Sequence, residues 1–226
     1  SLCPALVAAF TSNYVASLFG VVHEEVALSV HWNISIVTCF KVVCMGILFG
    51  LVGQLFAFLL GKIRFISRLY IKNPYLRIFV MGSGLALLFF VCGQGRYSGL
   101  GTNLVQSALN GGNIYPWDWV CKMLFTVFCL SAGFQGGEVT PLFAIGASLG
   151  LVLARLFGLP LALGAALGYV AVFGAGTNTF LAPIAIGLEL FGPQYFYLFF
   201  IVCSVSYLFN KDLSIYSLQE VIHGNE

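Results

Sequence analysis

The sequence predicts an all-α, polytopic membrane protein with tilted and broken helices, and three observations lead to this fold class. First, 60% of the 226 residues are hydrophobic and only 8% are charged, whereas about a quarter of the residues in a soluble domain carry charge. Second, the mean hydropathy is +0.98. Third, long apolar runs occur beside short runs that Gly and Pro interrupt. We therefore expect one transmembrane domain over residues 1–226 and no soluble globular fold.

The first three apolar runs cover residues 3–22, 33–61 and 78–92. A membrane-spanning helix needs about 20 apolar residues, and the second run is long enough to cross the bilayer with tilt. Between the second and third runs, five Lys and Arg residues fall within 62–77. This connection is predicted to be a loop and, because short loops rich in Lys and Arg stay inside, to be cytoplasmic.

Residues 93–114 are rich in Gly and Asn, so they are predicted to form a loop with one short amphipathic helix near 102–110. A further apolar helix is expected over 117–131. It contains Asp118 and Lys122. Because these residues stand at i and i+4, they are expected to pair on one helix face.

From residue 138 onward the apolar runs become shorter and are separated only by GLP, GAGTNT and GP. They cover 139–157, 161–173, 180–191 and 194–209. Several are too short to span a bilayer alone, which is typical of the broken helices that aim their ends at a mid-membrane site in transporters. The polar residues 210–226 are expected to be a cytoplasmic tail.

Small and polar residues at several positions predict local contacts. Gly146 and Gly150 have the spacing of a small-residue face, which lets two helices approach closely. Asn178 and Thr179 are expected to cap the start of the next short helix. Arg96, in the Gly-rich loop, is expected to be a structural anchor.

The stretch GFQGGEVTPLF, residues 133–143, places one carboxylate inside the apolar half of the chain. Gly136 and Gly137 allow a tight turn with no side chain to block an approaching ion, and Pro141 is tolerated near a helix start. The stretch is thus predicted to be a loop that enters a helix. The free N–H groups and the dipole at that helix start would favour an anion.

Glu138, the carboxylate of this stretch, has two interpretations from local chemistry alone, and both stay open. It can be a carboxylate that caps the helix start, where the dipole stabilises it. It can also be a protonatable group beside an ion path, because carboxylates inside membranes are energetically unfavourable and usually functional.

Other classes of function lack their motifs. The seven Cys residues show no CxxC spacing and are interpreted as small buried hydrophobic side chains, not as disulfides or a zinc site. The sequence contains no Ser-His-Asp set, metal-ligand cluster or phosphate loop, so no catalysis, metal or cofactor is expected. A net charge of +2 gives no reason to expect a nucleic-acid partner.

Four segments resemble the CLC chloride channel and transporter family, in the order in which the family has them. They are GRYSGLGTN (95–103), the stretch 117–143 that ends in SAGFQGGEVTPLF, ALGYVAVFGAGTNTFLAPIAIGLELFG (166–192) and IYSLQ (215–219). Where the family has a Gly-x-Phe-x-Pro loop at its central anion site, this chain has GEVTP from Gly137 onward. The GGEVTP version is similar to the bacterial, fluoride-selective branch, the CLC fluoride/proton antiporters.

The resemblance implies two inverted halves that meet at a mid-membrane anion site, of which this chain is the second half and the segment before it. The backbone amides of Glu138 and Val139 would face the anion, together with Gly137 and Thr140. Tyr216 would donate its hydroxyl from the start of the last helix. Glu138 would also carry the proton, because small, basic fluoride accepts a strong hydrogen bond from a protonated acid.

The implied activity is fluoride export coupled to proton antiport, by a homodimer in the lipid of the bacterial inner membrane with residues 3–22 and 180–209 at the dimer contact. The family's first-half loop and its gating glutamate, in a Gly-Arg-Glu-Gly type of stretch, have no counterpart here. Glu24 and Glu25 are interpreted as a membrane-interface end. Two alternatives stay open: a chloride channel or chloride/proton exchanger of the same fold, and a truncated membrane fragment that does not transport or that acts as an assembly partner.

Overall fold

The computed structural model describes residues 2–20, 28, 35–92, 95–210 and 213–216, and within these ranges the chain is helical without any strand. The predicted all-α fold class is confirmed. In chain order the helices are α1 (Leu2–Leu18), α2 (Ile36–Tyr70), α3 (Pro74–Val91), α4 (Thr102–Leu109), α5 (Asp118–Ala132), α6 (Val139–Phe157), α7 (Leu161–Thr177), α8 (Leu181–Phe191), the 3-10 turn η1 (Pro193–Tyr195) and α9 (Phe196–Leu208).

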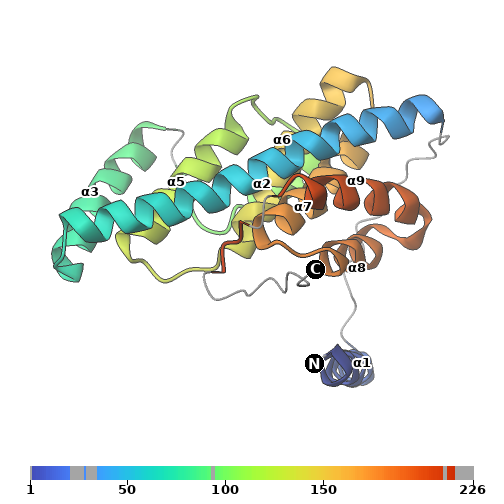
Figure 1. Cartoon of the computed structure of the whole chain (residues 1–226), viewed down its shortest axis with the longest axis horizontal. Coiled ribbons are helices and arrows are strands. Elements are labelled where there is room, and N and C mark those ends of the chain that lie inside the picture. The colour runs from blue at the N-terminus through green and yellow to red at the C-terminus, as the bar shows by residue number, and fades with distance from the viewer. Residues whose placement is uncertain (1, 21–27, 29–34, 93–94, 211–212, 217–226) are drawn as a thin grey trace, which may run out of the picture.

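The long helix α2 runs across the whole molecule (Figure 1) and is the largest difference from the predicted elements. Its 35 residues extend for about 52 Å. The predicted basic loop over 62–77 was wrong, because α2 continues to Tyr70 and only residues 71–73 separate it from α3. Lys and Arg are good helix formers, and α3 begins soon after α2 ends, with the Asn73 side chain accepting hydrogen bonds from the N–H groups of Tyr75 and Leu76.

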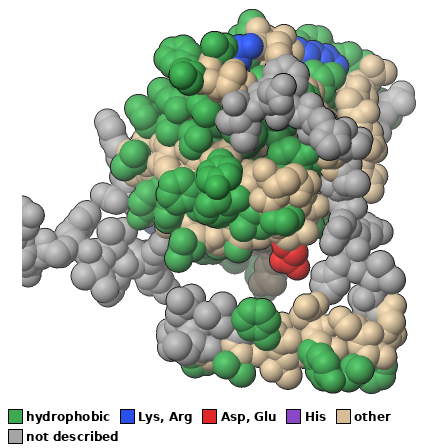
Figure 2. Space-filling view, turned by 90° about the vertical axis from the view of Figure 1, so that its right-hand side faces the viewer, with side chains coloured by type: hydrophobic (Ala, Val, Ile, Leu, Met, Phe, Trp, Pro, Cys, Tyr) green, Lys and Arg blue, Asp and Glu red, His purple; other side chains and the backbone are tan. Residues whose placement is uncertain are grey.

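Within the described part of the chain, three helices are long and apolar enough to cross a membrane by length and composition: α2, α3 and α6. Helices α7, α8 and the η1–α9 segment are apolar but shorter, as the broken-helix pattern predicted. Hydrophobic side chains cover much of the face drawn in Figure 2. Helix α1 lies apart from the other helices (Figure 1), and its side chains from Val7 to Leu18 are largely exposed.

Helices α6 and α7 form the tightest contact of the fold. A Cβ added to Gly146 would lie 2.1 Å from the carbonyl oxygen of Gly168, and one added to Gly150 would lie 2.1 Å from that of Gly164. The predicted close packing at the small-residue face is therefore confirmed, and the partner supplies matching glycines. In lipid, where apolar burial does not hold helices together, such close backbone packing does.

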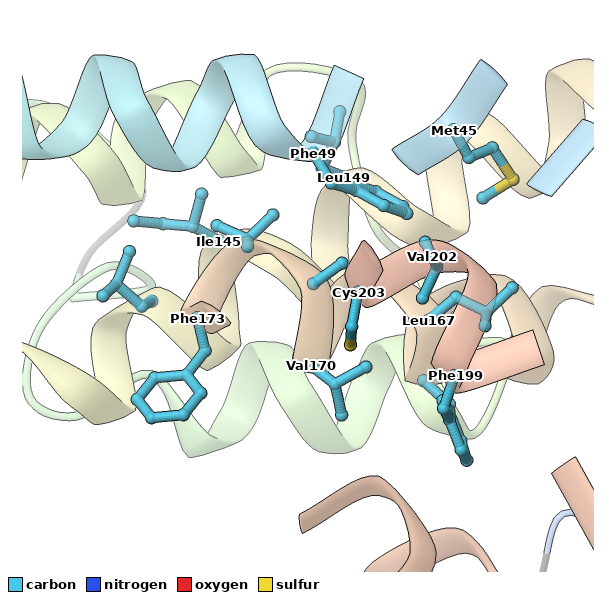
Figure 3. Close-up of a cluster of buried hydrophobic side chains, with 14 of the residues drawn as sticks. Met45, Phe49, Ile145, Leu149, Leu167, Val170, Phe173, Phe199, Val202 and Cys203 are labelled. Atoms are coloured by element: carbon cyan, nitrogen blue, oxygen red, sulfur yellow. The ribbon is translucent and has the colours of Figure 1, made fainter. Parts of the chain in front are cut away.

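The main core lies where α2, α6, α7 and α9 converge (Figure 3). Its side chains come from all four helices: Met45 and Phe49, Ile145 and Leu149, Leu167, Val170 and Phe173, and Phe199, Val202 and Cys203. Of the cysteines whose side chains are described, only Cys203 is buried; the other five are half-buried, and all six are free. Among these six, the interpretation as buried hydrophobic side chains therefore holds for Cys203, and the other five are only partly buried.

Candidate functional site

The N-terminus of α6 begins where the sequence predicted it, at residue 139 after the glycine pair. Gly133 ends α5 with φ 107°, a left-handed conformation that favours glycine. Residues 134–137 then run without helix, exposed, to Glu138. A Cβ on Gly137 would meet no atom within 4 Å, so the backbone is open to close approach at this point. The free N–H groups of the first turn of α6 lie next to it.

The Glu138 side chain does not cap α6. Its backbone is helical at φ −84° and ψ −23°, and the carboxylate makes no capping hydrogen bond. Instead Oε1 lies 3.3 Å from Nη2 of Arg64 in α2; the Glu138 side chain is 24% exposed and that of Arg64 31%. Of the two interpretations left open, the capping one is wrong as far as a side-chain capping hydrogen bond is concerned, although Glu138 does stand at the N-cap position. Its carboxylate has an arginine partner that the sequence did not predict.

Ser67 holds the end of α2 against the loop that carries Glu138. Its buried hydroxyl donates to the carbonyl oxygen of Ser131 at 2.8 Å, and Arg77 of α3 donates to the next carbonyl, that of Ala132, at 3.1 Å. These bonds fix the C-terminus of α5 to α2 and α3. The loop to Glu138 starts at this point. Arg64 lies one helical turn before Ser67 on α2, so it lies close to that loop.

Tyr216 lies in a non-helical segment, residues 213–216, and its side chain is 46% exposed. Its backbone N–H donates to the Ser214 hydroxyl. Residues after Tyr216 lie outside the described part of the chain, as do Glu24 and Glu25. Among the described residues no hydrogen bond joins the Tyr216 hydroxyl to Gly137, Glu138, Val139 or Thr140.

The GAGTNT turn, residues 174–179, ends α7 and leads into α8. Asn178 ends α7 with φ 51°, a conformation that Asn tolerates, and α8 starts at Leu181 without a side-chain cap. The predicted capping role of Asn178 and Thr179 was therefore wrong.

Two of the hydrogen bonds that hold this turn come from Asn210, a residue for which the sequence predicted no role. Its amide donates to the carbonyl oxygen of Ala175 at 2.6 Å and to that of Leu213 at 2.9 Å. The Ile215 N–H donates to Gly176 O at 3.0 Å. Asn210 is the polar residue that directly follows the apolar run 194–209, and this position was the signal from which a structural role could have been predicted.

The end of α2 also borders a cavity of about 330 Å³. One face of α2, from Ala57 to Arg68, forms one side, and Ser214 and Ile215 form the other. Arg64 lines this cavity and also contacts Glu138. Through α2 the structure thus connects the two parts of the predicted site, Glu138 and the segment that ends in Tyr216.

A second charged cluster lies at the start of α5 and is structural. Asp118 is fully buried and accepts hydrogen bonds from Arg96, from the Tyr97 hydroxyl at 2.7 Å and from the Tyr115 N–H at 2.9 Å. The predicted Asp118–Lys122 pair was wrong, because a two-pronged guanidinium contact is stronger. Lys122 donates instead to loop carbonyls, those of Tyr97 and Gly99.

This cluster confirms Arg96 as an anchor of the loop between α3 and α4. The hydrogen bond to Asp118 raises the pKa of the Arg96 guanidinium, so it stays charged. Burial, and then the hydrogen bond to Asp118, raises the pKa of the Tyr97 phenol, which keeps it a donor. In the described part of the chain, no three His, Cys, Asp or Glu residues gather as metal ligands.

Comparison with known proteins finds the same segments in one family. Residues 1–211 match the family model described as voltage gated chloride channel. A chloride/fluoride channel protein from Pseudomonas syringae pv. tomato (strain ATCC BAA-871 / DC3000) is 42% identical over 232 residues, which cover 99% of this chain and 51% of that protein. A crystal structure of a CLC-type fluoride/proton antiporter matches with a TM-score of 0.93 at 48% identity, over 97% of this chain and 55% of that one. The chain therefore spans about half the length of these relatives.

Proposed function

Because the chain belongs to the voltage-gated chloride channel family, we propose that the protein moves a small halide anion across a membrane, and that it exports fluoride in exchange for protons. Both named relatives support fluoride as the ion, and the solved one supports proton antiport. Transport by the family needs no covalent chemistry on a substrate, so the protein is proposed to act without catalysis.

The observation that carries the proposal is Glu138 at the open N-terminus of α6. The helix start supplies unpaired N–H groups and a partial positive charge, which together attract an anion. The carboxyl group beside it can hold a proton. A protonated acid donates a strong hydrogen bond to fluoride, which is a smaller and more basic acceptor than chloride.

The proposed anion contacts are Gly137, the backbone amides of Glu138 and Val139, the side chain of Thr140, and the Tyr216 hydroxyl. Support for the first four is that they are consecutive at the start of α6. Support for Tyr216 is that its segment is bonded to the end of α7 and borders the cavity that Arg64 shares.

We place the protein in the bacterial inner membrane as a multi-pass homodimer, with residues 1–226 in one transmembrane domain and 210–226 as a cytoplasmic tail. The apolar, largely exposed helix α1, which contacts no other described helix, supports a role in the dimer contact. The exposed Phe196, Tyr197 and Phe200 on α9 support a contact at 180–209 as well.

The test is anion release from proteoliposomes that contain the protein, with fluoride and chloride electrodes read side by side. Fluoride release far above chloride release supports the proposal. Equal or greater chloride release would assign the protein to the chloride channels or exchangers of the same fold.

Glu138→Gln removes the proposed proton carrier and is expected to abolish proton-coupled fluoride transport. The matched control is Glu189→Gln, the same change at an exposed carboxylate of α8, which should transport normally. Unchanged transport by Glu138→Gln would refute the proposal that Glu138 carries the proton.

A further inference from the structure

The cavity beside the end of α2 is lined by positive charge. Arg64 and Arg68, four residues apart and therefore on one face of α2, both line it, and among the described residues no carboxylate does. Arg68 makes no hydrogen bond or ion pair to any described residue, whereas Arg64 makes one, to Glu138. A cavity lined by two guanidinium groups, of which only Arg64 has a carboxylate partner among the described residues, has the electrostatics of an anion site.

The cavity also has the size and the polar partners that a small hydrated anion needs. Its volume of about 330 Å³ holds a halide and several waters, since one water occupies about 30 Å³. The donors available to an anion are the N–H groups of Arg64 and Arg68, since the half-buried Ser214 on the opposite wall already donates its one hydroxyl proton to Thr177 O and accepts from the Tyr216 N–H. Ser214 and Ile215, the two residues before Tyr216, both line the cavity.

The Arg64–Glu138 contact is of a kind that an anion can displace. It is a single contact at 3.3 Å between side chains that are 31% and 24% exposed, and partly exposed single ion pairs are weak. Arginine carries five N–H donors, of which this contact uses one.

We propose that the cavity lined by Arg64, Arg68 and Ser214 binds a small monovalent anion, and that Arg64 is a positioning residue shared between this anion and Glu138. When an anion occupies the cavity, Arg64 contacts the anion and Glu138 is released. When the cavity is empty, Arg64 returns to the carboxylate. The release of Glu138 rests on the proposed function, whereas anion binding in the cavity does not depend on which ion is transported.

The first experiment locates the anion directly. Crystals of the protein soaked in bromide are expected to give an anomalous peak within contact distance of Arg64 and Arg68, and the peak should disappear in Arg68→Gln. No peak in the wild type would overturn the proposal. Density that continues into an acyl chain would also overturn it, by assigning the cavity to an anionic lipid headgroup.

The second experiment measures the concentration dependence of halide flux in proteoliposomes. Arg68→Gln is expected to raise the KM for the anion by about tenfold, because it removes one charge-assisted hydrogen bond, with the maximal rate little changed. Arg64→Gln should raise KM and also change the maximal rate, since it alters Glu138 as well. Arg64→Lys should recover part of both.

Lys62→Gln is the matched control, because it removes a positive charge from the same end of α2 but does not line the cavity. An equal KM for Lys62→Gln and Arg68→Gln would overturn the site. The two proposals fail separately: bromide in the cavity without fluoride–proton exchange would refute only the proposed function, and fluoride–proton exchange without bromide binding would refute only the cavity site.

Discussion

Replacing Gly150 with alanine tests the close packing of α6 and α7 that holds the site in place. The new Cβ would lie 2.1 Å from Gly164 O, whereas a carbon and an oxygen normally approach to about 3.3 Å. The helices would therefore have to separate by about 1.2 Å at this point. A gap of that size removes a quarter to a half of the dispersion energy of the atoms that face it, or more.

The expected net loss in free energy of unfolding is about 2 kcal/mol. Overpacking against a backbone oxygen, which cannot rotate away, belongs at the upper end of the usual range, about 3 kcal/mol. The greater helix propensity of alanine offsets about 1 kcal/mol of this. A loss of that size lowers the ratio of folded to unfolded protein about 30-fold.

The assay is equilibrium unfolding of the purified protein in detergent, with Gly61→Ala as the matched control. Gly61 is an exposed glycine inside α2, and a Cβ there meets no atom within 4 Å. The control should therefore be as stable as the wild type or more so. If Gly150→Ala were as stable as Gly61→Ala, the argument that the glycine contact determines the α6–α7 distance would be refuted.

Three further changes test the remaining contacts. Asp118→Asn leaves the Arg96 guanidinium without its counter-charge and should lower the free energy of unfolding by about 3 kcal/mol; wild-type stability in the same assay would contradict this. Lys122→Met removes the donor to the carbonyls of Tyr97 and Gly99, so amide hydrogen exchange in residues 95–101 should rise roughly tenfold, and unchanged exchange would show that these two bonds do not hold the loop. Asn178→Val should destabilise by about 1–2 kcal/mol more than Asn178→Gly, because a β-branched residue is unfavourable at φ 51°; equal stability of the two variants would exclude backbone strain at this position.

Local sequence signals predicted most of the helices. The runs at 102–110, 117–131 and 139–157 correspond to α4, α5 and α6 within one residue at each end. Glycines, Pro141 and the change from polar to apolar residues mark these boundaries, and such signals act within a few residues of each other. The same holds for the small-residue face at Gly146 and Gly150.

The predictions that failed are those for which the sequence offers two options, either two local signals that favour different structures or two possible partners for one side chain. The basic residues at 62–68 read as a loop because of their charge, but their helix propensity and the apolar residues between them continue α2 to Tyr70. Asp118 could pair with Lys122 on its own helix, yet Arg96 brings two donors to it from 22 residues away. A one-dimensional pattern contains both options and does not rank them.

The sequence by itself determined the membrane character, the family and the loop-to-helix geometry at Glu138, because composition and local conformational preferences are properties of short segments. Only the tertiary structure decided which groups meet there. Arg64 and Glu138 are 74 residues apart, and Asn210 contacts Ala175 across 35 residues. Such contacts depend on how α2, α5 and α7 pack, and packing is set by the shapes of many side chains together, which no single segment contains.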